Sequence, residues 1–410
     1  MRSGVTKKPI GSIFALLFAL AVPVPGWSAG NPLLVAMGDS IGEGVQGADA
    51  AWQTQFFSYV NLVGLLLQQQ VSVPFIQSGL FGVVGNTEGR SRIYPNAVTT
   101  NVAVSGATVN SLLYDQADAA VTGAINSETD LVLFPRQQTQ IGYVETAIPA
   151  VVLCWIGNND VLSTATAFGN LDGSQLTPLA DFDRDYRALA ARLSPLVTNN
   201  GTKVVFANLP DVTAIGLLAN RATAEAILGF PVDLPDGSYT SIITVLLMGL
   251  FGNDDLLQFP NFVLDSSEVA LIRSRTQEFN AIIQREADAL GMPVVDINAK
   301  FNELLANPPI FLGIPVTNRL LGGLFSLDGV HPSNIGHALI ANEFVTTMNQ
   351  AFGMTLPVFN QAALEFLFST DPSIDKDGDG KAVGRLGVGL IETLAFILGI
   401  TGDSNDFLAN

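Results

Sequence analysis

Short apolar runs alternate along this chain with longer segments in which apolar residues recur every three or four positions. Five of the runs have the length of a buried strand, and they cover residues 33–37, 100–104, 150–156, 203–207 and 293–297. Apolar runs without polar alternation indicate strands that are covered on both faces. The pattern therefore predicts a five-stranded parallel sheet with helices on both sides.

Two of the longer segments have the periodicity of amphipathic helices. They are residues 181–197 and 266–290, and Ser266 or Ser267 is the expected N-cap of the second. Strands alternating with helices predict an α/β fold, a three-layer α/β/α sandwich that resembles flavodoxin. In such a sheet, functional residues are expected beyond the carboxyl ends of the strands.

Two segments are longer than this sheet requires. Residues 212–262 and 301–325 are apolar and interrupted by Gly and Pro, which predicts insertions at the strand ends. We expect residues 30–352 to form one domain that includes both insertions, and residues 353–410 to form a C-terminal extension. The apolar run in this extension could be a membrane anchor or a helix packed on the body. Its short length and Glu392 favour the packed helix.

The N-terminal segment has a different character from the rest of the chain. Residues 1–29 begin with three cations, continue with an apolar run and end in small residues. This order predicts a secretory signal peptide, cleaved after Ala29, and a retained membrane anchor is the alternative. The protein is therefore expected to be exported, either secreted or periplasmic.

Charge and cysteine content exclude several classes of function. The formal net charge is −18, and it becomes −21 without the three cations of the predicted leader. An anionic protein repels phosphates, so nucleic acid is not an expected partner. Cys154 is the only cysteine, which excludes an intrachain disulfide and a cysteine-based metal site. It lies in an apolar run, where a small core residue is expected rather than a reactive thiol.

Candidate chemistry begins with "GDSIGEG", which places Ser40 directly after the first predicted strand. A serine needs a general base, and the chain offers two histidines, His331 and His337. Asp328 lies three residues before His331 in "DGVHP". A carboxylate at this spacing can accept the imidazole Nδ1–H and leave Nε2 free to take a serine proton. His337 falls inside the following predicted helix, where we expect a packing role.

Four segments stand after predicted strands or on the last loop, in the order "GDSIGEG", "SGATVN", "GNND" and "DGVHP". Together they resemble the SGNH, or GDSL, hydrolase superfamily of serine esterases and lipases. The resemblance extends over roughly residues 33–350, and Ile41 stands where the leucine of the GDSL motif is usual. It implies a hydrolase that works through an acyl-serine intermediate, with no metal or organic cofactor required.

The resemblance also implies a role for each matching residue. Ser40 would be the nucleophile, and Asp328 and His331 would complete a catalytic triad. Three donors would form the oxyanion hole, namely the backbone N–H groups of Ser40 and Gly106 and the side-chain amide of Asn159. Taken singly, Ser40, Gly106 and Asn159 could equally be turn or capping residues.

The expected substrate is a small-molecule or lipid ester. Apolar insertions at the active-site end favour an aliphatic acyl chain and transient contact with a lipid surface. An O-acetyl carbohydrate esterase is an alternative. So is a non-catalytic protein that uses the same fold to bind lipid or a partner. The oligomeric state does not follow from the sequence.

The acidic stretch "DKDGDGK" near the C-terminus resembles the first half of an EF-hand loop. It places Asp375, Asp377 and Asp379 at alternate positions, as the carboxylates of a structural calcium site would be. Position twelve of such a loop would be Leu386, where a bidentate Glu is needed. A solvated acidic turn is therefore the alternative.

Overall fold

The structure, a computed structural model, describes residues 33–78, 83–166, 175–378 and 380–382. At its centre is a sheet of four parallel strands in the order β1-β4-β5-β9. These strands comprise Leu34–Gly38, Val151–Trp155, Lys203–Ala207 and Val294–Val295. Every residue of β1 and β4 is buried. The α/β fold with a parallel sheet agrees with the prediction.

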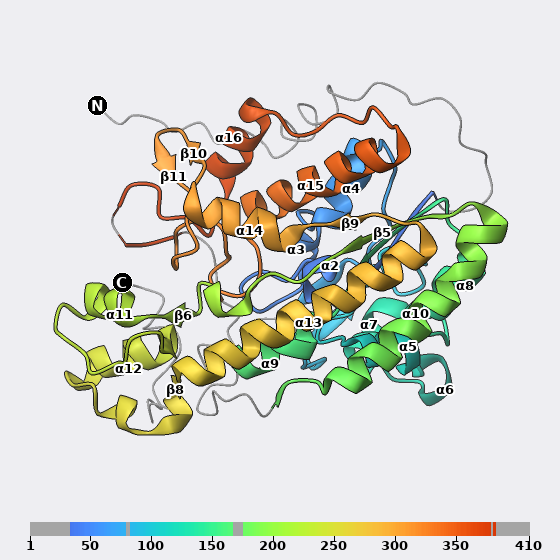
Figure 1. Ribbon diagram of the computed structural model, residues 1–410. Helices are drawn as coiled ribbons and strands as arrows, with labels where there is room; N and C mark the ends of the chain where they lie inside the picture. The colour runs from blue at the N-terminus through green and yellow to red at the C-terminus, as the bar shows by residue number, and fades with distance from the viewer. Residues whose placement is uncertain (1–32, 79–82, 167–174, 379, 383–410) are drawn as a thin grey trace.

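Helices cover both faces of this sheet (Figure 1). The main helices on the two faces are α4 (Tyr59–Leu66), α10 (Leu179–Asn200), α13 (Ser266–Leu290) and α15 (Asn334–Phe352). α10 and α13 run side by side on one face, and the rings of Phe182 and Phe279 stack between them with centroids 3.7 Å apart. α4 and α15 pair on the other face through Tyr59 and Phe344, whose ring centroids are 4.8 Å apart. The core therefore forms two apolar layers, one on each side of the sheet.

The remaining elements surround these layers. The other helices of the described residues are α2 (Ser40–Glu43), α3 (Trp52–Gln55), α5 (Val109–Tyr114), α6 (Ala119–Thr122), α7 (Glu128–Leu133), α8 (Gln140–Ala147), α9 (Asn159–Thr166), α11 (Arg221–Leu228), α12 (Ile242–Phe251), α14 (Ile297–Ala306) and α16 (Gln361–Thr370). Three small antiparallel sheets consist of β2–β3 (Ile76–Ser78, Arg90–Arg92), β6–β7–β8 (Leu218–Ala219, Tyr239–Ser241, Val263–Leu264) and β10–β11 (Ile310–Phe311, Ile314–Pro315). Single 3₁₀ turns span Val212–Ala214, Asp255–Gln258 and Pro260–Phe262.

The prediction of a fifth strand at residues 100–104 is wrong. This segment lies beside β1, and the N–H of Val102 donates to the carbonyl of Ala36 at 2.8 Å. A regular ladder would next require the N–H of Gly38, but that group donates to Oε1 of Gln140 at 2.9 Å. The pairing therefore reduces to one isolated bridge between Ala36 and Asn101. A side chain from α8 has taken the place of a ladder hydrogen bond.

The two predicted helices are present, with one change at a terminus. Residues 181–197 lie within α10, and α13 has the predicted bounds of 266–290. The N-cap of α13 is Asp265, rather than Ser266 or Ser267. Its carboxylate accepts the N–H groups of Ser267 and Glu268, and the Glu268 side chain accepts the N–H of Asp265 in return. This reciprocal capping box satisfies more helix donors than a serine cap alone.

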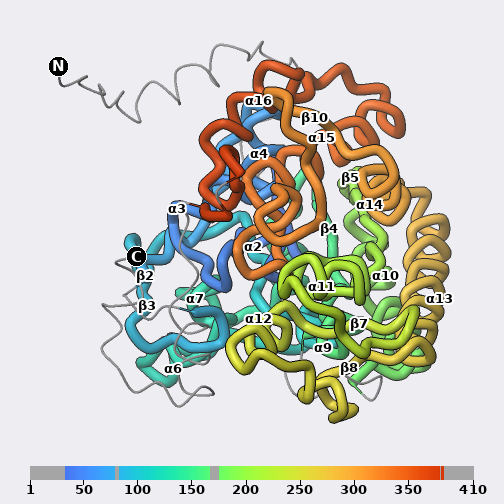
Figure 2. The backbone as a smooth tube through the Cα atoms, turned by 90° about the vertical axis from the view of Figure 1, so that its left-hand side faces the viewer, coloured from blue at the N-terminus to red at the C-terminus, as the bar shows by residue number. Residues whose placement is uncertain are grey.

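The segment 212–262 forms a small module with its own core beside the main body. It contains α11, α12 and the strands β6 and β7, which pair with β8 directly after it, and Ala224, Val245 and Met248 are fully buried within it. Figure 2 shows this module below α14, on the side where α2 lies. The other predicted insertion, 301–325, begins inside α14 and continues through the β10–β11 hairpin.

Several predictions fall on residues that the structure does not describe. Residues 1–29, predicted as a signal peptide, and the apolar run at 385–400 both lie outside the described ranges. Within the described part of the extension, α16 packs on α15. Among the helices of the described ranges, none combines the length and apolar character that crossing a membrane requires.

Candidate active site

Ser40 occupies the first turn of α2, directly beyond the carboxyl end of β1. Asp39 caps this helix, since its Oδ1 accepts the N–H of Ile41 at 3.0 Å. Gly38 lets β4 approach closely, because a Cβ at this position would lie 2.4 Å from the carbonyl oxygen of Trp155. Gly44 ends the helix with a left-handed φ of 97°. The motif thus makes a tight strand-to-helix turn that holds the serine at the sheet edge.

The serine hydroxyl lies at one end of a chain of two hydrogen bonds. Its Oγ is 2.8 Å from Nε2 of His331, and Nδ1 of His331 is 2.8 Å from Oδ2 of Asp328. The two partners lie 291 and 288 residues further along the sequence, on the loop before α15. The structure therefore brings together the three residues that the sequence predicts as a triad. An imidazole between a carboxylate and a hydroxyl can accept the hydroxyl proton.

The carboxylate of Asp328 is held by several donors besides His331. Its Oδ1 accepts the backbone N–H groups of Val330 and His331 at 2.8 and 2.9 Å, and the Ser326 hydroxyl at 3.1 Å. Its Oδ2 also accepts the N–H of Ala48 at 2.7 Å. Burial alone would raise the pKa of Asp328, but the charge of His331 and the hydrogen bonds from His331 and Val330 lower it to about 2. Asp328 is therefore ionised at neutral pH and oriented before any substrate binds.

Besides Ser40 in α2, the predicted oxyanion donors are Asn159, the first residue of α9, and Gly106, on the loop before α5. Asn159 lines the same cavity as Ser40 and His331, and its Nδ2 donates to the carbonyl of Ala107 at 2.9 Å. Gly106, the residue before Ala107, is exposed and has a φ of 78°. Within the described residues, no acceptor binds the backbone N–H of Gly106 or Ser40. Both groups are therefore available to a ligand, and Asn159 fixes the loop that carries one of them.

The cavity beside Ser40 is apolar, with a volume of about 100 Å³. Ile41, Val212 and Ile215 line it close to the sheet edge, and side chains from α14 and α15 continue it outward. A second cavity of about 150 Å³ lies around Gly106 and has mainly polar walls, including Ser105. The two cavities share no lining residue among those that the structure describes, and Gly106 lines only the polar one.

Three buried polar residues support the Ser40 turn and were not predicted. Gln140 makes two hydrogen bonds to the backbone of Gly38. Its Oε1 accepts the glycine N–H, and its Nε2 donates to the glycine carbonyl at 3.0 Å. Asn158 donates to Oδ2 of Asp39 at 2.9 Å. Asn158 adjoins the predicted Asn159, so its position was a usable indication. Gln140 lies on a different helix, and no pattern in the sequence marks it.

Glu43 is the third of these residues, and it joins the Ser40 turn to the loop that carries Gly106. Its Oε2 accepts the N–H of Ser105 at 2.7 Å and the Ser105 hydroxyl at 2.5 Å. Burial, with a smaller contribution from the nearby charge of Glu128, raises the pKa of Glu43 to about 8. Its place in "GDSIGEG", three residues after Ser40, could have indicated this role.

Two further buried polar residues, His337 and Asp160, make hydrogen bonds to the backbone of other helices. His337 is fully buried in α15, and its Nδ1 accepts the N–H of Tyr59 at 3.2 Å. Burial lowers the pKa of His337 to about 3, so this imidazole is neutral and packs as a core residue. Asp160 accepts the N–H of Val109, the first residue of α5, at 3.1 Å, and burial raises its pKa to about 6.

The predicted calcium loop lies partly outside the described residues, because Asp379 is not among them. Asp375 uses both carboxylate oxygens within the turn, accepting the N–H groups of Gly378 and Gly380 at 2.8 and 2.9 Å. The part of the chain that the structure describes contains no group of three His, Cys, Asp or Glu side chains placed to hold a metal ion. The calcium site, and with it Asp377, stays an untested prediction.

Comparison with known proteins identifies one family. The model of the family described as GDSL-like Lipase/Acylhydrolase matches residues 34–344, which is more than half of the chain. A search of curated proteins finds no match.

Solved structures with a partly similar backbone include LAE5, an alpha/beta hydrolase enzyme from the metagenome of Lake Arreo, Spain. It is 18% identical, and the match covers 79% of this chain and 97% of LAE5 with a TM-score of 0.39. Another is Axe2, an acetylxylan esterase from Geobacillus stearothermophilus. It is 17% identical, with coverage of 80% and 96% and a TM-score of 0.38.

Proposed function

Because the chain belongs to the GDSL-like lipase/acylhydrolase family, we propose that it is an exported serine hydrolase of aliphatic carboxylic esters. The observation that carries this proposal is the hydrogen-bonded chain from Ser40 through His331 to Asp328, beside an apolar cavity. A non-catalytic lipid-binding protein on the same fold would not need this arrangement. Ser40 lies 291 residues from His331 in the sequence, and the fold nevertheless places the two side chains at hydrogen-bond distance.

In the first half of the proposed reaction, Ser40 Oγ attacks the ester carbonyl carbon while His331 Nε2 accepts the hydroxyl proton. Asp328, already ionised, stabilises the imidazolium that forms. The carbonyl oxygen becomes an oxyanion, which the N–H groups of Ser40 and Gly106 and the amide of Asn159 would bind. Each such donor is typically worth about 10²–10³ in rate. The tetrahedral intermediate then expels the alcohol, which takes the proton from His331, and leaves an acyl-serine.

In the second half, a water molecule replaces the alcohol. His331 accepts a proton from this water as its oxygen attacks the acyl carbon. The same oxyanion donors bind the second tetrahedral intermediate. Its collapse releases a carboxylic acid and returns the proton from His331 to Ser40 Oγ. No residue is consumed, and no cofactor enters the proposed sequence of steps.

The apolar walls of the cavity support an aliphatic acyl group as the preferred substrate. The exposed side chains of α12 add to this support, because Leu246, Leu250 and Phe251 are 51%, 62% and 58% exposed on the 212–262 module. Apolar side chains on one helix suit contact with lipid aggregates. We therefore propose transient contact of this module with a lipid surface.

An O-acetyl carbohydrate ester is the second candidate, and the polar cavity around Gly106 favours it. Ser105, Thr108 and Ser111 line this cavity, and their hydroxyl groups can hydrogen-bond to the hydroxyl groups of a sugar. An acetyl group would need little of the apolar cavity. The preferred acyl length therefore separates the two candidates.

The test is hydrolysis of p-nitrophenyl esters from acetate to palmitate by the mature protein, by Ser40→Ala and by Ser369→Ala. Ser369 is an exposed serine of α16 and serves as the matched control. We expect activity at medium or long chains, its loss in Ser40→Ala and its retention in Ser369→Ala. A steep preference for acetate would support the carbohydrate esterase. Equal rates for Ser40→Ala and the parent would overturn the catalytic role of Ser40.

The proposed export rests on the first 29 residues alone. Expression of the full chain, followed by N-terminal sequencing of protein from the medium, the periplasm and the cytosol, tests it. A mature protein that begins near Gly30 outside the cytosol supports cleavage. Intact protein retained in the membrane fraction would favour the anchor instead.

A further inference from the structure

The apolar cavity beside Ser40 continues between α14 and α15, and each helix contributes one face to it. The lining residues of α14 are Ile297, Lys300, Phe301 and Leu304. Those of α15 are Gly336, Leu339, Ile340 and Glu343. In both helices they occupy positions i, i+3, i+4 and i+7, which share one side of a helix. The cavity is therefore a channel that has two helical walls and includes Ser40 in its lining.

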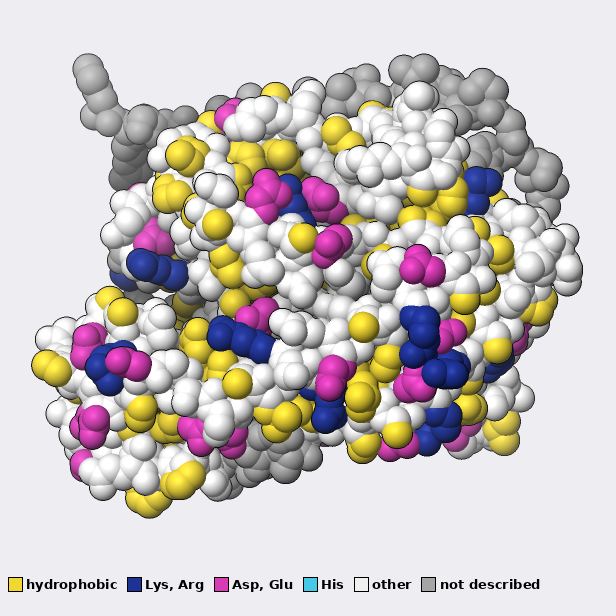
Figure 3. All heavy atoms as spheres, in the orientation of Figure 1, with side chains coloured by type: hydrophobic (Ala, Val, Ile, Leu, Met, Phe, Trp, Pro, Cys, Tyr) yellow, Lys and Arg dark blue, Asp and Glu magenta, His cyan; other side chains and the backbone are white. Residues whose placement is uncertain are grey.

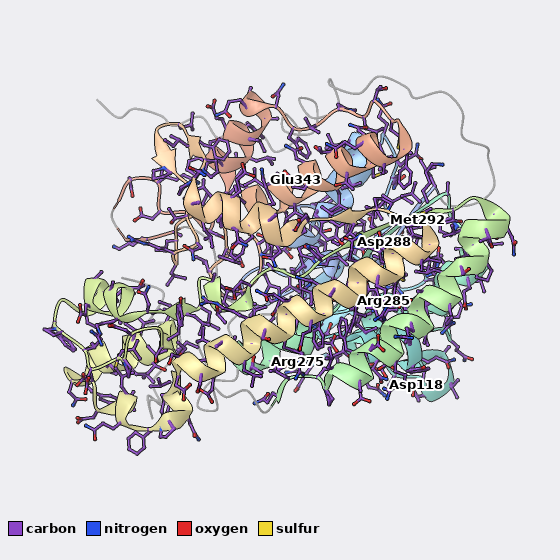
Figure 4. The ribbon with its side chains drawn as sticks, viewed as in Figure 1. Asp118, Arg275, Arg285, Asp288, Met292 and Glu343 are labelled. Carbon is purple, nitrogen blue, oxygen red and sulfur yellow. The ribbon has the colours of Figure 1, made fainter. Side chains whose placement is uncertain are left out.

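A single ion pair joins these walls. Nζ of Lys300 lies 3.2 Å from Oε1 of Glu343, and their side chains are 25% and 29% exposed. These two are the only Asp, Glu, Lys or Arg residues among the described residues that line the channel. Figure 4 shows Glu343 on α15 where this helix lies beside α14, and Figure 3 shows acidic side chains on both sides of a basic one over the same two helices.

The distance along the α15 wall from Gly336 to Glu343 follows from the geometry of the helix. Gly336 lies five residues after His331, and Glu343 lies seven residues further along α15. Seven residues of α-helix extend about 10 Å. An extended hydrocarbon advances about 1.3 Å per carbon, given C–C bonds of about 1.5 Å. The distance along the wall to the ion pair therefore corresponds to roughly eight carbons.

We propose that the channel between α14 and α15 is the acyl-chain subsite, and that the Lys300–Glu343 pair, which joins its two walls, sets the longest acyl chain bound efficiently. The inference rests on the proposed ester hydrolysis and names its substrate class as medium-chain acyl esters. Each methylene buried against apolar walls adds about fourfold to binding. This gain stops where a longer chain would reach Lys300 and Glu343, because these charged groups are stabilised by each other and by water.

The first test narrows the channel. Leu304→Trp places a larger side chain on the α14 wall, and Leu271→Trp makes the same change on α13, where Leu271 is 44% exposed. We expect kcat/KM for p-nitrophenyl octanoate, relative to butyrate, to fall at least tenfold in Leu304→Trp and to stay at the parent ratio in Leu271→Trp. An unchanged ratio in Leu304→Trp would overturn the assignment of the channel.

The second test removes the charges of the Lys300–Glu343 pair. Lys300→Met with Glu343→Leu replaces the pair by apolar side chains of similar length, and we expect the ratio of laurate to octanoate turnover to rise at least tenfold. Glu303→Gln is the matched control, because Glu303 lies 3.1 Å from Lys300 but outside the channel. A laurate ratio at the parent value in the double variant would show that the pair does not limit chain length.

The outcomes separate this inference from the proposed function. An active parent enzyme whose chain-length profile is the same in all variants would leave ester hydrolysis standing and overturn the subsite. For a parent that hydrolyses none of the esters, thermal stabilisation of the Ser40→Ala protein by sodium octanoate is the deciding measurement. Stabilisation that Leu304→Trp removes and Leu271→Trp keeps would support the channel. Equal stabilisation in both variants, or none at all, would overturn it.

Discussion

Replacing Asp328 by Asn should damage both activity and stability, by amounts that follow from its surroundings. Five donors point at the two carboxylate oxygens, three at Oδ1 and two at Oδ2. An amide offers one oxygen and one NH₂ group. Whichever way it is rotated, the NH₂ of Asn faces donors rather than acceptors. The variant would therefore lose hydrogen bonds and favour the wrong tautomer of His331.

The stability change can be worked from the pKa of Asp328, which is about 2 in the folded protein against 3.8 for an unperturbed Asp. A pKa lowered by folding contributes stability above the unfolded value, and this contribution is lost as the pH falls through the folded value. At 1.36 kcal/mol per unit, the contribution is about 2 kcal/mol at pH 7. At pH 3, about half of it remains. Asp328→Asn should thus lower the free energy of unfolding by about 2 kcal/mol at pH 7 and by less at pH 3.

Urea unfolding at pH 7 and pH 3, with kcat/KM on an active ester at pH 7, measures both effects. Asp236→Asn is the control, because the Asp236 side chain is 95% exposed in its ion pair with Arg221, and such pairs contribute little. For Asp328→Asn we expect kcat/KM to fall about 10³–10⁴-fold. A loss of less than tenfold would refute the assigned role of Asp328. A stability difference that does not shrink at low pH would refute the electrostatic reasoning.

Three further predictions concern the support of the serine turn and the oxyanion. Asn159→Ala should lower kcat about 10²–10³-fold with a smaller effect on KM, measured on the preferred ester; a change in KM alone would contradict its role as an oxyanion donor. Glu43→Gln should flatten the pH dependence of stability. Because the folded pKa of Glu43 is raised to about 8, the parent is expected to lose stability as the pH rises from about 4.5 to 8. Parallel profiles of Tm against pH for the two proteins would contradict this. Gln140→Leu leaves the buried N–H of Gly38 without an acceptor and should cost about 1–3 kcal/mol in urea unfolding; an unchanged midpoint would contradict this role of Gln140.

Local patterns in the sequence predicted the parts of the fold that depend on local interactions. The bounds of α13 follow from its apolar periodicity, and its Asp265 cap could have been read from the capping-box spacing to Glu268. The alignment of Asp328 with His331 is equally local, at a separation of three residues.

Residues 100–104 do not form the predicted strand, for a reason that no local pattern in the sequence indicates. The amide of Gln140 lies 102 residues from Gly38 and takes its N–H. Asn158 and Asp39, another supporting pair, are 119 residues apart. Hydrogen bonds between a side chain and a distant turn leave no periodicity, so only the folded structure reveals them.

The position of the single cysteine allows opening of the central sheet to be measured by thiol modification. Cys154 is fully buried in β4, between the strands β1 and β5, and burial raises the pKa of its thiol well above the usual range. A thiol reagent can reach this sulfur only when the central sheet opens. Because the chain has no other cysteine, the rate of modification by 5,5′-dithiobis(2-nitrobenzoic acid) would measure that opening without a background. The edge of the sheet beside Ser40 and the sheet itself can thus be followed separately, the first by the proposed ester turnover and the second by thiol modification.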